Sequence, residues 1–305
     1  MNFQQLETLV WLARLRNFHA VAGKLHTTQP SVSARLQRLE EDLGTRLVDR
    51  GPQGVALTAA GRECLIYAER ILAWQGRMRQ CAGGEDRLRG RVSVGVSEIV
   101  ACTWLPDLLH RLASRHPEVI IDTHVDLTPQ LARGLEEGSF DVILAGSYRL
   151  ATVHPTRSLG DTRLGWMAAP GAFAFREPAT PAALQRMPLI TWPEHSAIYS
   201  QISDWFAAGD VFPVPRHTSN SVVTLARLAT AGLGVALLPL QVVQRELDEG
   251  KLVLVPTRPD FPNVEYRAVY VERQGSLGAM VAEVAAECSS FTMTTGLGPR
   301  VRPAD

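Results

Sequence analysis

Short polar and forked basic side chains share one face of the segment from Thr27 to Gly44, which reads TTQPSVSARLQRLEEDLG. Its apolar residues recur at spacings of four, three and four, and this pattern predicts an amphipathic helix. Thr28 supplies a side-chain oxygen that caps the start of the helix, and Gly44 ends it. The polar face has no acidic residue before Glu40, and such hydroxyl, amide and guanidinium groups bind base edges and phosphates in a major groove. The predicted DNA-binding residues on this face are Thr28, Gln29, Pro30, Ser31, Ser33, Arg35 and Arg38, and the apolar stripe is Val32, Leu36, Leu39 and Leu43.

Two shorter amphipathic segments precede this helix. Residues Phe3 to Ala13 carry apolar side chains at helical spacing, and Phe18 to Leu25 repeat the pattern over a shorter stretch. His26 and Thr27 then form a tight turn. Three helices with a short turn before the last are typical of a winged helix-turn-helix domain, whose last helix reads DNA.

The same region resembles the LysR-type transcriptional regulators. The pieces QPSVS, RLE and LTAAG occur in this order, and the resemblance extends more loosely over the rest of the chain. In that family the positions that match Gln29, Pro30 and Ser33 read the bases, together with a basic neighbour. The resemblance therefore implies a sequence-specific transcription regulator that binds double-stranded promoter DNA.

The chain departs from the family pattern at two places. Ala34 stands where many members carry a basic residue, so we expect Arg35 or Arg38 to take that part. After Arg50 the predicted wing reads GPQGVA, without the arginines often found there. This difference argues against minor-groove contact by the wing, and Arg50 completes the predicted DNA-binding set.

The 305-residue chain has no net charge, but its charges are unevenly distributed. Residues 1–90 contain thirteen Lys and Arg against nine Asp and Glu, and the remainder contains eighteen against twenty-two. A basic N-terminal part followed by an acidic remainder suits a protein in which only the N-terminal part binds phosphate groups. Because no apolar run is long enough to span a membrane and no signal-peptide pattern is present, we expect a cytoplasmic protein without a membrane partner.

A long helix is predicted from its N-cap, Thr58, to about Ala82. Apolar residues recur along it at alternating spacings of three and four for more than three repeats, which is the pattern of two helices wound together. Such a pair would hold two recognition helices roughly 34 Å apart, as an interrupted dyad in promoter DNA requires. The predicted dimerisation residues are Ala60, Cys64, Tyr67, Ile71, Trp74 and Met78.

From Arg91 onward, strands and helices alternate, and this alternation predicts parallel sheets with crossover helices. The family resemblance implies two such lobes, joined by crossing strands near Gly160–Trp166 and Val264–Val269. The expected fold class is α+β multidomain: an N-terminal winged helix-turn-helix, a long linker helix, and a two-lobed α/β, periplasmic-binding-protein-like effector domain. The expected bounds are 1–58 for DNA binding, 59–90 for the linker helix and hinge, and 91–305 for effector binding, with lobe I at about 91–160 and 267–290, lobe II at about 165–264, and a disordered tail at about 295–305.

Ligands of such folds lie at the carboxyl ends of strands, close to helix N-termini. Ser97 and Thr128 match positions where members of the family hydrogen-bond their effectors, and they are expected to face each other across a cleft. Trp192 would supply an aromatic wall and His195 a titratable donor. The predicted effector-binding residues are Ser97, Glu98, Thr128, Gly146, Ser147, Trp192, His195, Ser196, Asn220 and Ser221.

The chemistry of the effector stays open between two classes. Hydroxyl groups at helix N-termini favour a carboxylate, whereas Glu98 at the same strand end would repel one unless it points away. An amino acid with both charges and an aromatic acid neutralised by Arg149 are the two alternatives.

Catalysis is disfavoured by the sequence. Ser97, His195 and Asp141 could form a triad on paper, but VGVSEI lacks the second glycine of a G-x-S-x-G elbow. The GLGVAL segment at Gly232 precedes a strand rather than a helix, unlike a dinucleotide-binding loop. A transport-type binding protein would fit the second half alone, but the N-terminal helices argue against it. No histidine spacing suggests a metal site, so neither a metal nor a cofactor is expected.

Four cysteines, Cys64, Cys81, Cys102 and Cys288, show neither a CxxC motif nor metal-ligand spacing. They are expected to act as small apolar residues. Peroxide-sensing members of the family use a cysteine pair in the second half of the effector domain. Because no cysteine lies between Cys102 and Cys288, we reject that mechanism for this chain.

The complete hypothesis is a DNA-binding regulator switched by a small organic effector that binds between two lobes. The resemblance further implies a homodimer or homotetramer and RNA polymerase as a partner. No pattern in the sequence identifies the effector, the target genes, or activation as opposed to repression.

Overall fold

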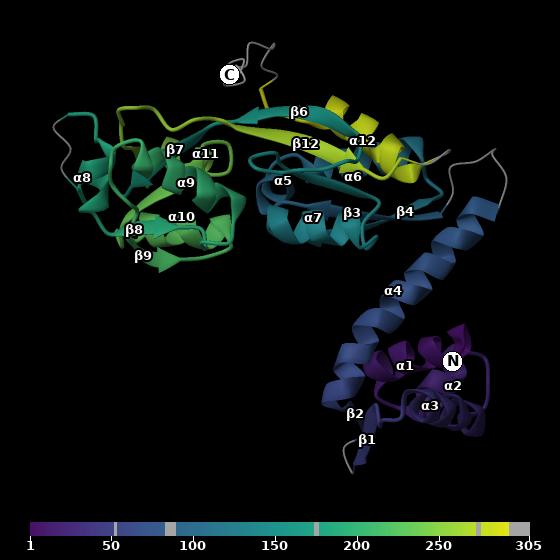
Figure 1. The fold of residues 1–305 in the computed structure, drawn as a ribbon. Coiled ribbons are helices and arrows are strands. Elements are labelled where there is room, and N and C mark those ends of the chain that lie inside the picture. Colours follow the sequence, from purple (N-terminus) through teal and green to yellow (C-terminus); the bar gives the residue numbers. More distant parts are fainter. Residues whose placement is uncertain (52–53, 83–89, 174–176, 273–275, 293–305) are drawn as a thin grey trace, which may run out of the picture. The chain divides into compact units, whose positions relative to one another are not determined.

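The computed structural model describes residues 1–51, 54–82, 90–173, 177–272 and 276–292. The chain divides into two compact units, Met1–Asp86 and Arg87–Asp305 (Figure 1). The hinge expected after Ala82 and the tail expected at about 295–305 lie outside the described residues.

The N-terminal unit packs three helices, a two-stranded hairpin and a long helix around one apolar cluster. The apolar stripe of the third helix contributes Val32, Leu36 and Leu39, which are fully buried. Leu43 was expected in this stripe but is 42% exposed, because it is the last helical residue before the left-handed turn at Gly44. The elements are α1 (Phe3–Leu15), α2 (Phe18–Lys24), α3 (Gln29–Leu43), β1 (Val48–Gly51), β2 (Gly54–Leu57) and α4 (Ala59–Ala82).

Lobe I of the second unit contains a five-stranded sheet in the order β4-β3-β5-β12-β6. The first three strands are parallel, and β12 runs antiparallel to both β5 and β6. Helix α12 returns from the far end of the chain to pack on this lobe (Figure 1). The elements of lobe I are β3 (Gly90–Val96), α5 (Glu98–Cys102), α6 (Leu105–Arg115), β4 (Val119–Val125), α7 (Thr128–Glu136), β5 (Val142–Gly146), β6 (Thr156–Thr162), β12 (Val264–Tyr270) and α12 (Leu277–Cys288).

Lobe II is built from the intervening part of the chain around a second five-stranded sheet, in the order β11-β7-β10-β8-β9. Its strands β10, β8 and β9 are parallel, whereas β7 runs antiparallel to β10. The chain enters lobe II between β6 and β7 and leaves it through β12. The elements are β7 (Leu164–Ala168), α8 (Pro181–Gln185), β8 (Leu189–Thr191), α9 (Ala197–Ala207), β9 (Pro215–Thr218), α10 (Val222–Thr230), β10 (Val235–Pro239), α11 (Gln244–Asp248) and β11 (Val253–Leu254).

One expected helix is interrupted. The apolar spacing predicts a single helix from Ile99 to Ala113, but the chain forms α5 and then α6. Pro106 lies in the first turn of α6, where its missing N–H leaves no hydrogen bond unmade, and the same residue could not continue the preceding helix.

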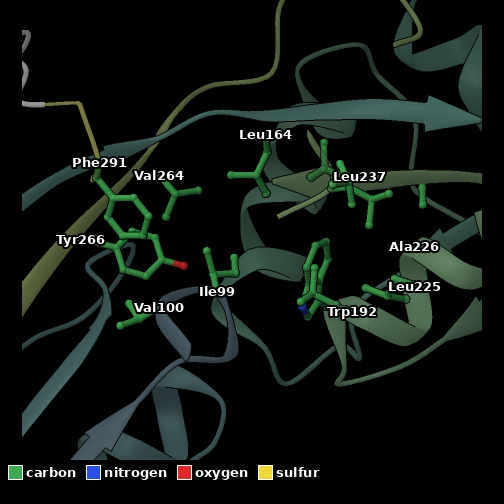
Figure 2. Close-up of a cluster of buried hydrophobic side chains, with 14 of the residues drawn as sticks. Ile99, Val100, Leu164, Trp192, Leu225, Ala226, Leu237, Val264, Tyr266 and Phe291 are labelled. Atoms are coloured by element: carbon green, nitrogen blue, oxygen red, sulfur yellow. The ribbon is translucent and has the colours of Figure 1, made fainter. Parts of the chain in front are cut away.

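The largest apolar cluster continues from one lobe to the other, and a smaller cluster lies within lobe I between α7, β5 and β12. On the side of lobe I, the ring of Phe291 packs on Trp104 and Tyr266, at centroid distances of 5.7 and 4.8 Å. Figure 2 shows Ile99 between Tyr266 and Trp192 within the largest cluster. Burial of this cluster supplies the main favourable term for folding the unit.

The contact between α4 and the hairpin region leaves no room for a side chain at Gly61. A Cβ atom there would lie 1.9 Å from the carbonyl oxygen of Leu47, which accepts a hydrogen bond from the N–H of Thr58. We expect Gly61→Ala to destabilise the N-terminal unit by roughly 1–3 kcal/mol, because the backbone must shift. Hydrogen exchange of amides in residues 1–82 measures this change.

Gly23→Ala is the matched control, since Gly23 is helical and has no atom within 4 Å of the added Cβ. It should leave protection unchanged or raise it slightly, because alanine favours a helix by roughly 0.5–1 kcal/mol over glycine. Equal protection in the two variants would contradict the close packing at Gly61.

Candidate functional site

Local capping positions the polar face of α3. The Oγ1 atom of Thr28 accepts a hydrogen bond from the N–H of Ser31 at 3.4 Å, and Pro30 lies in the first turn. Gly44 ends the helix at a φ of +66°. With the apolar stripe buried, the predicted DNA-binding residues lie on the opposite side: Thr28, Gln29, Pro30 and Arg38 are exposed, and Ser31, Ser33 and Arg35 are partly exposed.

The first acidic residue of α3, Glu40, is used inside the unit. Glu40 Oε1 accepts hydrogen bonds from the backbone N–H groups of Leu47 at 2.7 Å and Val48 at 3.2 Å. Among the described residues, neither Arg35 nor Arg38 has a carboxylate within ion-pair distance. The face therefore presents basic groups free to meet phosphate. Arg50 lies in β1, and its side chain is outside the described part.

The predicted dimerisation residues of α4 divide into two groups. Ala60, Cys64 and Ile71 pack against the apolar cluster of their own N-terminal unit. Tyr67, Trp74 and Met78 are instead 55%, 50% and 65% exposed. The spacing of three and four thus includes an intramolecular seam as well as an exposed apolar surface, formed by Tyr67, Trp74, Met78 and Ile66.

A cavity of about 220 Å³ lies where elements of lobe I meet elements of lobe II. It opens at the carboxyl ends of β3, β4, β5 and β8 and at the N-termini of α5, α7, α9 and α10. We call it the cleft. Its lining residues are Ser97, Glu98, Ile99, Val125, Asp126, Leu127, Thr128, Gly146, Tyr148, Trp192, Ser196, Ala197, Ile198, Gln201, Asn220, Ser221, Val222, Val264 and Tyr266.

Most of the predicted effector-binding residues line the cleft, and two do not. Ser147 turns away, since its Oγ donates a hydrogen bond to Glu265 Oε2 at 2.9 Å. His195 lies on an exposed turn outside the lining. The predicted residues in the lining are Ser97, Glu98, Thr128, Gly146, Trp192, Ser196, Asn220 and Ser221.

Glu98 crosses the cleft. It is the first residue of α5 in lobe I, and its Oε1 accepts a hydrogen bond from Ser221 Oγ of lobe II at 2.8 Å. Its Oε2 accepts a second hydrogen bond from the backbone N–H of Val222, the first residue of α10. A helix N-terminus favours a negative charge, so this carboxylate stabilises α10 from the opposite lobe.

A second polar contact joins the lobes beside the cleft. Asp204 of α9 accepts hydrogen bonds from the hydroxyl of Tyr148 and from Nη2 of Arg149, the latter at 2.7 Å. Burial raises the pKa of Tyr148, and the hydrogen bond to Asp204 and the charge of that carboxylate raise it further. Arg149, which could have neutralised an aromatic acid, is thus already paired with Asp204.

Several lining residues had no signal in the sequence. Tyr266 is fully buried, and this burial raises the pKa of its hydroxyl, which therefore stays neutral. Gln201 is 5% exposed and lies on the buried face of α9. Val264 and Tyr266 belong to a crossing strand that was expected, but nothing in its alternation showed which side chains would reach the cleft.

The catalytic triad considered from the sequence, Ser97, His195 and Asp141, is not assembled in the structure. Asp141 accepts a hydrogen bond from the N–H of Ser93 at 2.9 Å, at the start of β5, whereas Ser97 follows the end of the parallel strand β3. The two residues thus lie at opposite ends of neighbouring strands, and His195 lies outside the cleft. Within the described ranges, no cluster of His, Cys, Asp and Glu could hold a metal ion, and no helix is both long and apolar enough to cross a membrane.

Comparisons with known proteins match both units. Residues 85–288 match the LysR substrate binding domain, and residues 3–62 match the bacterial regulatory helix-turn-helix protein, lysR family. The SDS degradation transcriptional activation protein of Pseudomonas sp. (strain ATCC 19151) is 28% identical over 290 residues, which cover 92% of this chain and 93% of that protein. The probable hydrogen peroxide-inducible genes activator of Mycobacterium avium is 30% identical over 275 residues, 88% of each chain.

A solved structure agrees with the fold. Full-length CbnR complexed with its target DNA aligns with a TM-score of 0.68 and covers 95% of this chain and 100% of that chain. At 20% identity this likeness shows a shared fold and nothing finer.

The contact between Tyr148 and Asp204 predicts a shift in a tyrosine titration. Asp204→Asn removes the negative charge that helps to raise the pKa of Tyr148, so this pKa should fall towards its ordinary value of about 10. Tyr148 would then ionise at lower pH. Ultraviolet difference titration of the phenolate absorbance measures the change.

Asp210→Asn is the control, because Asp210 is an exposed carboxylate with a φ of +57°, a conformation that asparagine also tolerates. It should leave the titration of Tyr148 unchanged. Superimposable curves for wild type and Asp204→Asn would show that the interlobe contact does not form in solution.

Proposed function

The chain belongs to the LysR family of transcriptional regulators, and we propose that it binds promoter DNA through α3 and changes this binding when a small organic effector occupies the cleft. The exposed polar face of α3, with Glu40 withdrawn from it, is the observation that carries the DNA-binding part. The cleft between the lobes, lined by residues of both, supports the effector-binding part. RNA polymerase would be a further partner, and the cytoplasm the place of action.

The residues proposed to read DNA fall into two groups. Gln29 and Ser33 carry groups that can bind base edges, whereas Arg35 and Arg38 suit phosphates or a guanine edge. The complex with target DNA is a property of CbnR, and it supports the same mode of binding here only through the shared fold.

Sensing of peroxide through a cysteine pair is not proposed, although one relative is named as a peroxide-inducible activator. The sequence has no cysteine between Cys102 and Cys288. Partial burial raises the pKa of both thiols, and the thiolate is the form that reacts with oxidants. The cleft is therefore the proposed sensor. A catalytic role is not proposed either, because His195 lies outside the cleft and Asp141 lies at the opposite end of the neighbouring strand from Ser97.

Assembly is proposed to use the exposed apolar surface of α4. A homodimer, or a tetramer built from dimers, would place two copies of α3 on successive major grooves of an interrupted dyad. Effector binding in one arrangement of subunits would then shift the population towards it, with a coupling of about 1–3 kcal/mol typical for such systems.

The DNA-reading role predicts different effects for two kinds of variant. Gln29→Ala should reduce discrimination between operator and random DNA by roughly 1–3 kcal/mol, because a base contact is lost. Arg38→Ala should weaken binding to both DNAs similarly and flatten the salt dependence, because a phosphate contact is lost. Fluorescence anisotropy with the chain's own upstream DNA and a scrambled duplex measures both. If Gln29→Ala keeps the specificity ratio of the wild type, α3 does not read bases through this residue.

The assembly role predicts that Trp74→Asp gives a monomer with weak operator affinity, because a charge would enter the helix pair. Trp74 is preferable to Ile71, since Ile71 packs within its own subunit and its replacement would also unfold that core. Light scattering measures the molar mass. Val153→Asp, at a site that is 93% exposed in the second unit, controls for the added charge and should leave the mass unchanged. A dimeric Trp74→Asp would rule out this surface as the interface.

A further inference from the structure

The charged side chains that line the cleft are all acidic. Glu98 and Asp126 are among its described lining residues, and no arginine, lysine or histidine is. Arg149 lies next to a lining residue but is already paired with Asp204. A ligand carboxylate would therefore leave water without gaining a positive partner, and it would approach two like charges.

The N-terminus of α10, one of four helix N-termini at the cleft, is already occupied by a carboxylate. The N-terminus of α10 offers the N–H of Val222 and the hydroxyl of Ser221, and both donate to Glu98. Because Glu98 is part of the chain, an incoming anion would have to displace a carboxylate that is held in place at high effective concentration. Hydroxyl groups at helix N-termini were the ground for considering carboxylate effectors, and the contact with Glu98 removes that ground at Ser221.

The rest of the lining suits a hydrogen-bond donor on an apolar body. Trp192 and Tyr266 supply aromatic rings on either side of Ile99, and aromatic faces attract cations (Figure 2). The amide of Gln201 donates from Nε2 to the carbonyl of Asn263 at 3.3 Å, which fixes its orientation. Its Oε1 has no hydrogen-bond partner within the described part of the chain, and a ligand N–H could supply one.

We propose that the cleft selects small organic amines, protonated at neutral pH and carried on an apolar body, and that it rejects carboxylates of the same shape. This inference rests on the proposed function, because it names the ligand class of the same effector site. Asp126 is the acidic group left to face the ammonium, since Glu98 is engaged with α10. Asp126 Oδ1 accepts a hydrogen bond from the N–H of Leu127 at 2.7 Å, and its carboxylate keeps its second oxygen for the ligand.

Matched probes test the charge preference on the full-length protein. A panel of pairs with similar skeletons, such as 2-phenylethylamine with 3-phenylpropanoate and butylamine with pentanoate, would be titrated by calorimetry. The amine of a pair should bind at least about tenfold more tightly than the acid, because the acid meets like charges. The neutral alcohol, 2-phenylethanol, should fall between the two.

Glu98→Ala tests the cause. It removes the carboxylate and frees the N-terminus of α10, so the acids should gain affinity and the tenfold preference should shrink or invert. Glu283→Ala removes an exposed carboxylate of α12 outside the cleft and should leave every affinity unchanged. Should Glu98→Ala fail to fold, Glu98→Gln removes the charge while retaining an acceptor, and it should move the preference in the same direction.

Two results would overturn the inference: acids that bind wild type as tightly as their paired amines, or a panel in which no amine binds. An unchanged preference in folded Glu98→Ala would equally remove Glu98 as its cause. Operator binding by the same samples separates this failure from that of the proposed function. A wild type that binds operator but prefers acids keeps its role as a regulator, whereas one that binds amines but not operator loses that role.

Discussion

The contact between the Glu98 carboxylate and the N-terminus of α10 links the shape of the cleft to its charge. The first N–H groups of any helix lack partners within the helix, and burial makes each unpaired group costly. Here Ser221 caps the N–H of Thr224, while Glu98 satisfies the N–H of Val222 from the other lobe. If the lobes separate, this carboxylate and this N–H both lose their partners. One side chain thus both links the two lobes and places a negative charge at the edge of the cleft.

Local features of the fold could be predicted because they depend on chain neighbours. Thr28, Gly44 and Thr58 delimit helices through hydrogen bonds and φ values set within a few residues, and the structure places all three where capping rules do. The burial of Val32 and Leu36 likewise follows from a spacing along one helix. Such signals determine where elements begin, end and face, although the break between α5 and α6 at Pro106 is a local feature that the apolar spacing concealed.

Contacts between distant segments could not be predicted in this way. Glu98 was expected in the cleft as a group that would repel a carboxylate unless it pointed away, and nothing in the sequence pairs it with Ser221, 123 residues away. Ser147 was expected in the cleft, but it binds Glu265 on a strand that arrives from the other lobe. The periodicity of α4 had a related limit. A stripe of apolar residues shows that a face is covered, and it does not show whether Ile71 is covered by its own subunit or by another.

The position of β12 has a consequence for how the protein is made. This strand lies between β5 and β6 and pairs with both, although it follows the whole of lobe II in the chain. During synthesis, β6 therefore has no neighbouring strand in its sheet until the ribosome has released residues near Tyr270. Lobe II is formed by one uninterrupted part of the chain, so its sheet can form before β12 is synthesised. Only the surface that packs on lobe I must wait. Lobe I, which begins first, is completed last, and its open sheet edge is the surface most exposed to mispairing while the chain is still being made.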